Sequence, residues 1–181
     1  WRLGTIYKFT DSVSAYFQYS QGFKVPPYDL AYFYYSHFIV TPCCTIIETV
    51  PNTDLVPEES DSYEIGIRGS VGNLSYNLSA YRSDYDNFIQ IVNLGTEENW
   101  DYGFPIDVYV SQYQNIESAE ISGVEFRFQY YMGHNVSLFL NGEWMDSEDK
   151  ETGEQLTSIQ PFNGTIGLNY FRGSFSMDAM L

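Results

Sequence analysis

Apolar and polar residues alternate along most of this 181-residue chain, and this alternation constrains the fold more than any other feature. Val13–Gln21 and Leu74–Arg82 each place apolar side chains at every second position. A period of two residues gives a β-strand one apolar face and one polar face. The pattern predicts an all-β chain of about eight strands. The expected strands are Gly4–Thr10, Val13–Gln21, Ser62–Val71, Leu74–Arg82, Ala119–Tyr131, Val136–Trp144, Thr165–Tyr170 and Ser174–Leu181, with further extended stretches at Phe88–Val92 and Val108–Tyr113.

The connections between these strands are alternately short and long. Gly72-Asn73 and Met132–Asn135 are tight turns, whereas 22–60 and Ser147–Gln160 are long. Outer-membrane barrels have short turns at one end and longer loops at the other, while a soluble sandwich more often has short turns at both. The asymmetry therefore predicts a segment of an antiparallel up-and-down transmembrane β-barrel, with 22–60 as a long extracellular loop.

Composition agrees with this fold and narrows the function. Aromatic residues reach 18% of the chain, which suits strands and a membrane interface. The 24 acidic and 8 basic residues give a net charge of −16, which disfavours a nucleic-acid partner. The excess of acidic residues indicates a solvated surface or, alternatively, an acidic mouth that attracts a cation or a basic protein. No motif of an enzyme active site occurs, so we expect no enzymatic activity.

The polar sides of the expected strands carry charged residues. They are Glu64, Arg68, Glu125, Arg127 and Glu143. In a large barrel these side chains face a water-filled or plugged lumen, while the aromatic face meets lipid. The sequence starts at Trp1 and ends at Leu181 within an expected strand, so we expect a piece of a longer protein.

Several stretches, in order and spacing, resemble the motifs of one family. Tyr16–Pro26 resembles the strand that ends in that family's Phe-Arg-Ala-Pro box, and Asn52–Glu58 resembles its Asn-Pro-Asn-Leu-Lys-Pro-Glu box. Ser60–Gly66 resembles the Ser-x-x-Tyr-Glu-x-Gly strand that follows. Further matching stretches are Tyr85–Ile89, Ala119–Glu125 and Gly153–Pro161. The family is that of the TonB-dependent outer-membrane receptors, large plugged barrels that import iron complexes.

This resemblance implies a segment of a larger barrel of about 22 strands, with the plug domain and the remaining strands outside residues 1–181. It implies a bacterial outer-membrane location, surrounding lipid, and transport powered by the TonB complex through the plug. It also implies no prosthetic group, because haem or another ferric complex is the transported ligand. We expect the box residues to support the loop between them. They are Phe23, Pro26, Asn52, Leu55, Pro57 and Glu58.

The haem and haemoglobin receptors of this family are similar in carrying a histidine between the two boxes, where it ligates haem iron. His37 occupies that place here. A neutral imidazole is a good iron ligand, and a tyrosine can stack on a porphyrin or ligate haem itself. The expected ligand-contacting residues are therefore His37, Tyr32, Tyr34 and Tyr35, with His37 as the iron ligand and haem, free or in a host haemoprotein, as the partner.

Other interpretations remain open at this stage. The sequence departs from the boxes at Lys24-Val25 and at Thr53, and both boxes occur loosely in siderophore receptors. A ferric-siderophore receptor, in which His37 is an ordinary loop residue, is the first alternative, and a structural or adhesin barrel is the second. The adjacent Cys43 and Cys44 rule out a disulfide framework. They are expected to be free, to pair with a group outside these residues, or else to provide a soft metal ligand.

Overall fold

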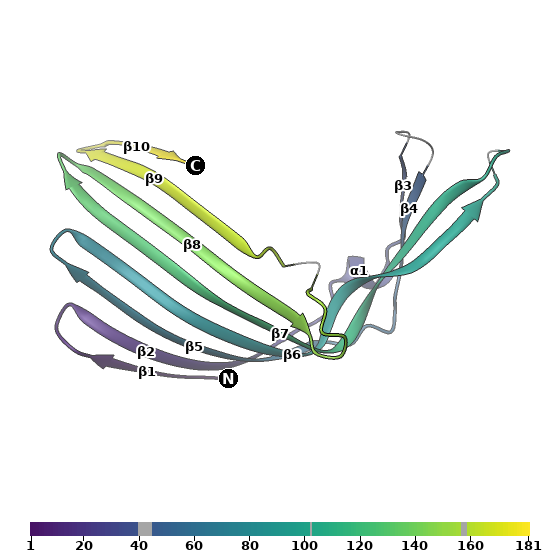
Figure 1. Ribbon diagram of the computed structural model, residues 1–181, viewed down its shortest axis with the longest axis horizontal. Helices are drawn as coiled ribbons and strands as arrows, with labels where there is room; N and C mark the ends of the chain where they lie inside the picture. The colour runs from purple at the N-terminus through teal and green to yellow at the C-terminus, as the bar shows by residue number, and fades with distance from the viewer. Residues whose placement is uncertain (40–44, 102, 157–158) are drawn as a thin grey trace. The chain divides into compact units, whose positions relative to one another are not determined.

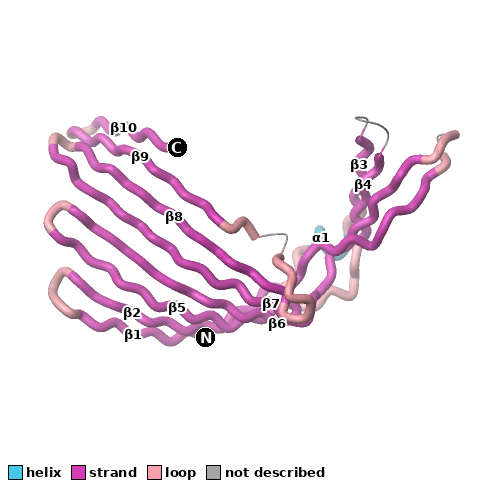
Figure 2. Tube along the Cα trace, viewed as in Figure 1, coloured by secondary structure: helices cyan, strands magenta, loops and turns pink. Residues whose placement is uncertain are grey.

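The computed structural model describes residues 1–39, 45–101, 103–156 and 159–181, and within them the chain is mostly strand (Figures 1 and 2). The prediction of an all-β fold is confirmed. One short helix occurs among the described residues, α1 (Tyr28–Tyr32). The strands are β1 (Arg2–Lys8), β2 (Val13–Lys24), β3 (Tyr35–Ile39), β4 (Thr45–Val50), β5 (Glu58–Val71), β6 (Leu74–Asn99), β7 (Ile106–Gly133), β8 (Val136–Asp149), β9 (Phe162–Arg172) and β10 (Phe175–Met180).

Eight of these strands lie next to one another in chain order, β1-β2-β5-β6-β7-β8-β9-β10. The pairs β1–β2, β8–β9 and β9–β10 are antiparallel, as an up-and-down topology requires. The predicted tight turns are present. Gly72 begins its turn with a φ of 59°. His134 and Asn135 have φ of 53° and 63°, the two positive values of the type I′ turn that suits the twist of a two-residue hairpin.

Two strands are longer than the sequence predicted. β6 runs without a break to Asn99, and β7 runs without a break from Ile106. The sequence analysis treated 84–118 as mixed and placed a loop after Val92, because polar residues interrupt the alternation there. β6 instead continues through Asn87, whose φ of 55° departs from the extended conformation. The count of about eight strands was also low, because β3 and β4 lie within 22–60.

The chain divides into two compact units, which we describe separately. Unit 1 comprises 1–22, 60–84 and 120–181, and unit 2 comprises 23–59 and 85–119. β6 and β7 contribute residues to both. Among the described residues, no helix has the length and apolar character needed to cross a membrane.

In unit 1 the charged residues predicted to share a face do so. Arg68 and Arg127 line one hollow, Glu125, Arg127 and Glu143 line a second, and Glu64 and Arg68 line a third. We call this the polar face of unit 1. Many large apolar side chains that alternate with these residues are exposed, which a sheet in water alone would not favour. They include Ile65, Val124, Leu140, Ile166 and Leu168.

Tyrosines lie over glycines on this polar face. The Tyr16 ring covers Gly66, and its hydroxyl donates to Glu64 Oε1 over 2.6 Å. The Tyr81 ring covers Gly123, and its hydroxyl donates to Glu143 Oε1 over 2.7 Å. Because glycine has no Cβ, the ring can lie flat across the neighbouring strand while its hydroxyl reaches a carboxylate. These contacts tie adjacent strands of unit 1 together.

Unit 2 has a small core of its own. β4 pairs in parallel with β7, from Thr45 opposite Asp107 to Val50 opposite Gln112, and antiparallel with β3. The buried side chains come from alternate positions of β4 and of the first part of β7. They are Ile46, Ile106, Val108 and Val110, with Val50 packed against them. Burial of this one face leaves the other face of the β3–β4–β7 sheet exposed.

Candidate ligand-binding site

The second box, Asn52–Glu58, and the Pro51 that precedes it are held by hydrogen bonds with β7. Asn52 Nδ2 donates to the carbonyl of Tyr113 over 2.8 Å, and Gln112 Nε2 donates to the carbonyl of Pro51 over 2.9 Å. Asn52 Oδ1 also accepts from the backbone N–H of Asp54 over 3.1 Å, which fixes the turn after it. Asn52 therefore connects this turn to β7, and its role as a support of the loop stays a prediction.

Asn115 holds the same segment and was not identified from the sequence. Its Oδ1 accepts from the backbone N–H of Val56 over 2.9 Å, and its Nδ2 donates to the carbonyl of Val56 over 3.0 Å. Nδ2 also donates to the carbonyl of Asn87 over 2.6 Å, where β6 has its positive φ. One amide thus connects the second box to both β6 and β7. The sequence signal for it was an amide-rich stretch that continues past the expected extended segment Val108–Tyr113.

Glu58 links the two boxes. Its side chain is 6% exposed, its Oε1 accepts from the backbone N–H of Ile89 over 2.9 Å, and its Oε2 lies 3.2 Å from Lys24 Nζ. A buried carboxylate needs such partners, because an unpaired one is costly. Lys24 stands where the family's first box has arginine, and it keeps the positive charge that Glu58 pairs with. The Lys24–Glu58 ion pair thus joins the two boxes in this chain.

The remaining box residues are less enclosed. The Phe23 side chain is exposed, Pro26 and Leu55 are half-buried, and Pro57 is exposed. The two prolines fix φ and cannot donate a backbone hydrogen bond to a ladder.

His37 lies on the exposed face of the unit 2 sheet. It is paired with Ile47 of β4, and Ile47 is paired with Tyr109 of β7. Directly paired residues point to the same face, so these three side chains form one row across three strands. The Tyr35 ring lies beside the imidazole at 6.4 Å between centroids and 13° between planes. We call this surface, with Tyr35, His37, Ile47 and Tyr109, the His37 face.

The other predicted tyrosines point elsewhere. Tyr32 stacks on Tyr28 across α1 at 4.6 Å between centroids. Tyr34 hydrogen-bonds Glu48, and this bond raises the pKa of the Tyr34 phenol. Glu48 alternates with Ile47 along β4, so it belongs to the opposite face. The structure therefore brings His37 together with Tyr35 and not with Tyr32 or Tyr34, and it adds Tyr109, which sequence reasoning missed because it lies far along the chain.

The chemistry available on the His37 face is limited and specific. One imidazole, two phenols and the apolar Ile47 side chain are all open to solvent, with exposures of 59% for Tyr35, 42% for Tyr109 and 40% for Ile47. Within the described ranges, no three His, Cys, Asp or Glu residues gather in a way that could hold a metal ion. An imidazole such as that of His37 can provide one axial ligand to an iron ion that a macrocycle or chelator already holds. Cys43 and Cys44 lie outside the described residues.

Comparison with known proteins identifies the class. Residues 1–179 match the family described as TonB dependent receptor-like, beta-barrel. The chain is 25% identical over 184 residues to the vitamin B12 transporter BtuB of Photobacterium profundum, covering 98% of this chain and 26% of that protein. It is 31% identical over 127 residues to a probable hemoglobin and hemoglobin-haptoglobin-binding protein of Haemophilus influenzae, covering 68% of this chain and 11% of the relative.

Solved structures agree on the fold. The ferric enterobactin receptor PfeA of Pseudomonas aeruginosa, in a G324V variant, superimposes with a TM-score of 0.65 at 20% identity, covering 99% of this chain and 26% of the receptor. The siderophore receptor PirA of Acinetobacter baumannii gives 0.61 at 22% identity, covering 96% and 26%. The chain belongs to the TonB-dependent receptor β-barrel family. It spans about a quarter of the length of BtuB and of these receptors.

Proposed function

We propose that this chain is the ligand-contacting part of a bacterial outer-membrane receptor that imports haem, free or presented by a haemoprotein, with energy from the TonB complex. The observation that carries the proposal is the His37 face. The exposed His37 imidazole lies beside the nearly parallel Tyr35 ring on β3. The two boxes that flank β3 in the sequence are anchored by Asn52, Asn115 and Glu58.

Rigid support around an exposed imidazole suits capture of a metal complex. A site is more selective when its ligand is held in one geometry before binding, because less ordering is needed on association. Here β3 is held by β4, and β4 is held by β7. The exposed apolar side chains of unit 1 support an outer-membrane location, since a lipid-facing band is the surface that such residues favour.

A ferric-siderophore receptor is the second candidate. The exposed rings of Tyr28, Tyr32 and Phe33 pack on one another at α1, at 4.6 Å and 5.7 Å between centroids. A cluster of this kind can contact an aromatic chelator without any contribution from His37. In that case the transported ligand is an iron complex whose iron needs no protein ligand.

Haem titration of the full-length receptor in detergent tests the proposal. We expect wild type to bind haem with a defined Soret band, and His37→Ala to lose affinity about tenfold or more or to shift the band, since each 1.4 kcal/mol is tenfold in affinity. His134→Ala is the matched control, because His134 is the other histidine and lies in the β7–β8 turn. Unchanged haem binding by His37→Ala would contradict the assignment of His37. Absence of haem binding by wild type would favour the siderophore candidate.

A further inference from the structure

The strand register of unit 2 places nine side chains on the side of the sheet that carries His37. β4 pairs antiparallel with β3 and in parallel with β7, so the three strands lie side by side. Paired residues point to the same side of a sheet, and so do residues two positions apart on one strand. The nine side chains therefore form three rows across β3, β4 and β7. The rows are Tyr35 with Thr49 and Ser111, His37 with Ile47 and Tyr109, and Ile39 with Thr45 and Asp107.

The two outer rows differ in chemistry. The first presents three hydroxyl groups and no charge, because Tyr35 is 59% exposed and both Thr49 and Ser111 are half-buried. The third row ends in the exposed carboxylate of Asp107. Each outer row starts roughly 7 Å from the row of His37, measured along the strands. The His37 imidazole therefore has hydroxyl donors on one side of it and a negative charge on the other.

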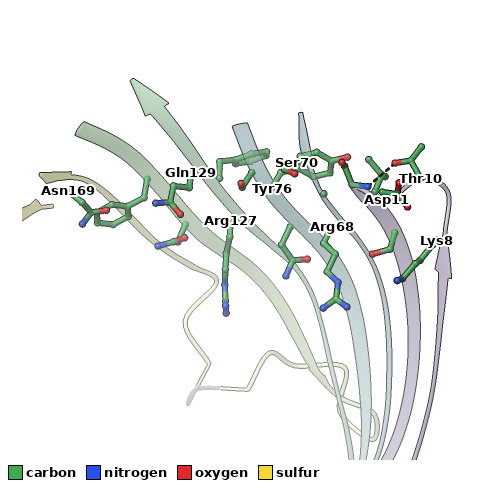
Figure 3. A pocket seen from close by; sticks show the side chains of 18 residues that line it. Lys8, Thr10, Asp11, Arg68, Ser70, Tyr76, Arg127, Gln129 and Asn169 are labelled. Atoms are coloured by element: carbon green, nitrogen blue, oxygen red, sulfur yellow. Dashed lines mark hydrogen bonds between the residues drawn. The ribbon is translucent and has the colours of Figure 1, made fainter. Parts of the chain in front are cut away.

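None of these nine positions is occupied by lysine or arginine. The polar face of unit 1 is different, since Figure 3 shows the basic side chains of Lys8, Arg68 and Arg127 on it. On the His37 face a carboxylate of a ligand can be bound only through neutral donors. Hydroxyl groups are suited to this, because a hydrogen bond to an ionised acceptor is stronger than one between neutral groups.

We propose that the row of Tyr35, Thr49 and Ser111 binds the carboxylates of haem, and that Asp107 repels them from the opposite side of His37. The inference rests on the proposed function, in which His37 ligates the iron. Haem carries its carboxylates on one edge of the ring, so the two outer rows select one orientation of the ring about the bond between His37 and iron. The three hydroxyl residues are then specificity determinants that favour an anionic macrocycle over a neutral one.

Titration of the full-length receptor in detergent with haem and with haem dimethyl ester, followed by the Soret band, tests this. The ester has the same ring and iron but no carboxylate charge, so it reports iron ligation and apolar contact alone. We expect wild type to bind haem about tenfold more tightly than the ester. The triple variant Tyr35→Phe, Thr49→Val, Ser111→Ala should reduce this preference to about twofold or less and keep its affinity for the ester.

A variant of the third row should act in the opposite direction. Asp107→Asn should strengthen haem binding about threefold at low ionic strength and leave ester binding unchanged. Added salt should reduce this gain, because the interaction between exposed charges is screened. Ser36→Ala is the matched control, since it removes a hydroxyl group from β3 on the other face of the sheet, where Ser36 is paired with Glu48. It should change neither affinity.

The outcomes separate this inference from the proposed function. Equal affinity of wild type for haem and ester, an unchanged preference in the triple variant, or weaker haem binding by Asp107→Asn would overturn the inference. Haem import would still stand in those cases if His37→Ala lost affinity or shifted the Soret band. Failure of wild type to bind either compound would overturn both. If the triple variant lost the ester as well, it would be misfolded, and the preference of Tyr35→Phe alone, at an exposed position, would decide.

Discussion

The two units use the same two-residue alternation with opposite results for their apolar side chains. In unit 1 the apolar positions are exposed, as Ile65 and Leu168 are, and order on the other face comes from rings lying over glycines. In unit 2 one alternate set of apolar positions on β4 and β7 is buried together, from Ile46 to Val110, and polar side chains such as Asn115 anchor loops. Alternation alone therefore fixes which residues share a face, and the neighbouring structure decides which face is covered.

The largest expected loss of stability follows from substituting the glycines that lie under tyrosine rings in unit 1. Gly66→Val places a branched side chain against the Tyr16 ring, and we expect it to lower the free energy of unfolding by about 3 kcal/mol. Denaturant unfolding of the full-length receptor in detergent measures this loss. Gly4→Val is the control, because a Cβ at Gly4 meets only an ordinary contact at 3.6 Å. Adding Tyr16→Ala to Gly66→Val should recover part of the loss, and no recovery would argue against the ring contact as its cause.

In unit 2 the largest effect should come from the buried carboxylate. Glu58→Ala leaves the N–H of Ile89 without its acceptor and Lys24 without its partner, so we expect a local loss of about 2 kcal/mol. Hydrogen exchange of the full-length receptor should show faster exchange in unit 2 and unchanged exchange in the β8–β9 part of unit 1. The exposed neighbour Glu59 provides the comparison through Glu59→Ala. Equal exchange in the two variants would show that the boxes are held by other contacts.

A smaller effect is expected at the amide that connects β6, β7 and the second box. Asn115→Ala loses three hydrogen bonds at a partly exposed site, and we expect about 1 kcal/mol of local stability to be lost, concentrated at 52–58. Asn115→Asp keeps the acceptor for the Val56 N–H but sets a carboxylate oxygen against the carbonyl oxygens of Val56 and Asn87, so its exchange should be at least as fast as that of Asn115→Ala. Exchange of Asn115→Asp at the wild-type rate would show that the two bonds donated by Nδ2 contribute nothing.

The smallest effect concerns pH. The bond to Glu48 raises the pKa of Tyr34, so its folded form holds the phenol proton longer than an ordinary tyrosine does. The resulting stabilisation is complete below the ordinary tyrosine pKa of about 10 and is lost as pH rises through the raised value. In an alkaline titration, the difference in tyrosinate absorbance between wild type and Tyr34→Phe should therefore develop at a higher pH than for an ordinary tyrosine. In a Glu48→Gln background it should appear earlier, and an unmoved difference would contradict the bond.

Sequence reasoning predicted the fold well where structure depends on neighbours in the chain. The alternation gave the faces of Glu64, Arg68, Glu125, Arg127 and Glu143, and two-residue turns such as His134-Asn135 were recognisable because few residues tolerate positive φ. The resemblance indicated the family, which the comparisons confirm.

The candidate site was less predictable because its contacts are distant in sequence. Nothing in Thr45–Val50 specifies a parallel partner, and nothing in the stretch around Asn115 marks a residue that holds Val56 and Asn87. The same holds for Tyr109, whose row with His37 exists only through β4. The role of His37, Tyr32, Tyr34 and Tyr35 in ligand binding stays a prediction.

The parallel pairing of β4 with β7 also sets an order of events when the chain is made. Thr45 can pair only after Asp107 has been synthesised, and Asn52 can form its bond only after Tyr113 has been synthesised. A contact between residues so far apart forms slowly, because the intervening chain must first give up its freedom. The surface that carries His37 is therefore finished only after the β6–β7 hairpin exists, and a chain halted before residue 112 would carry the histidine without the sheet that presents it.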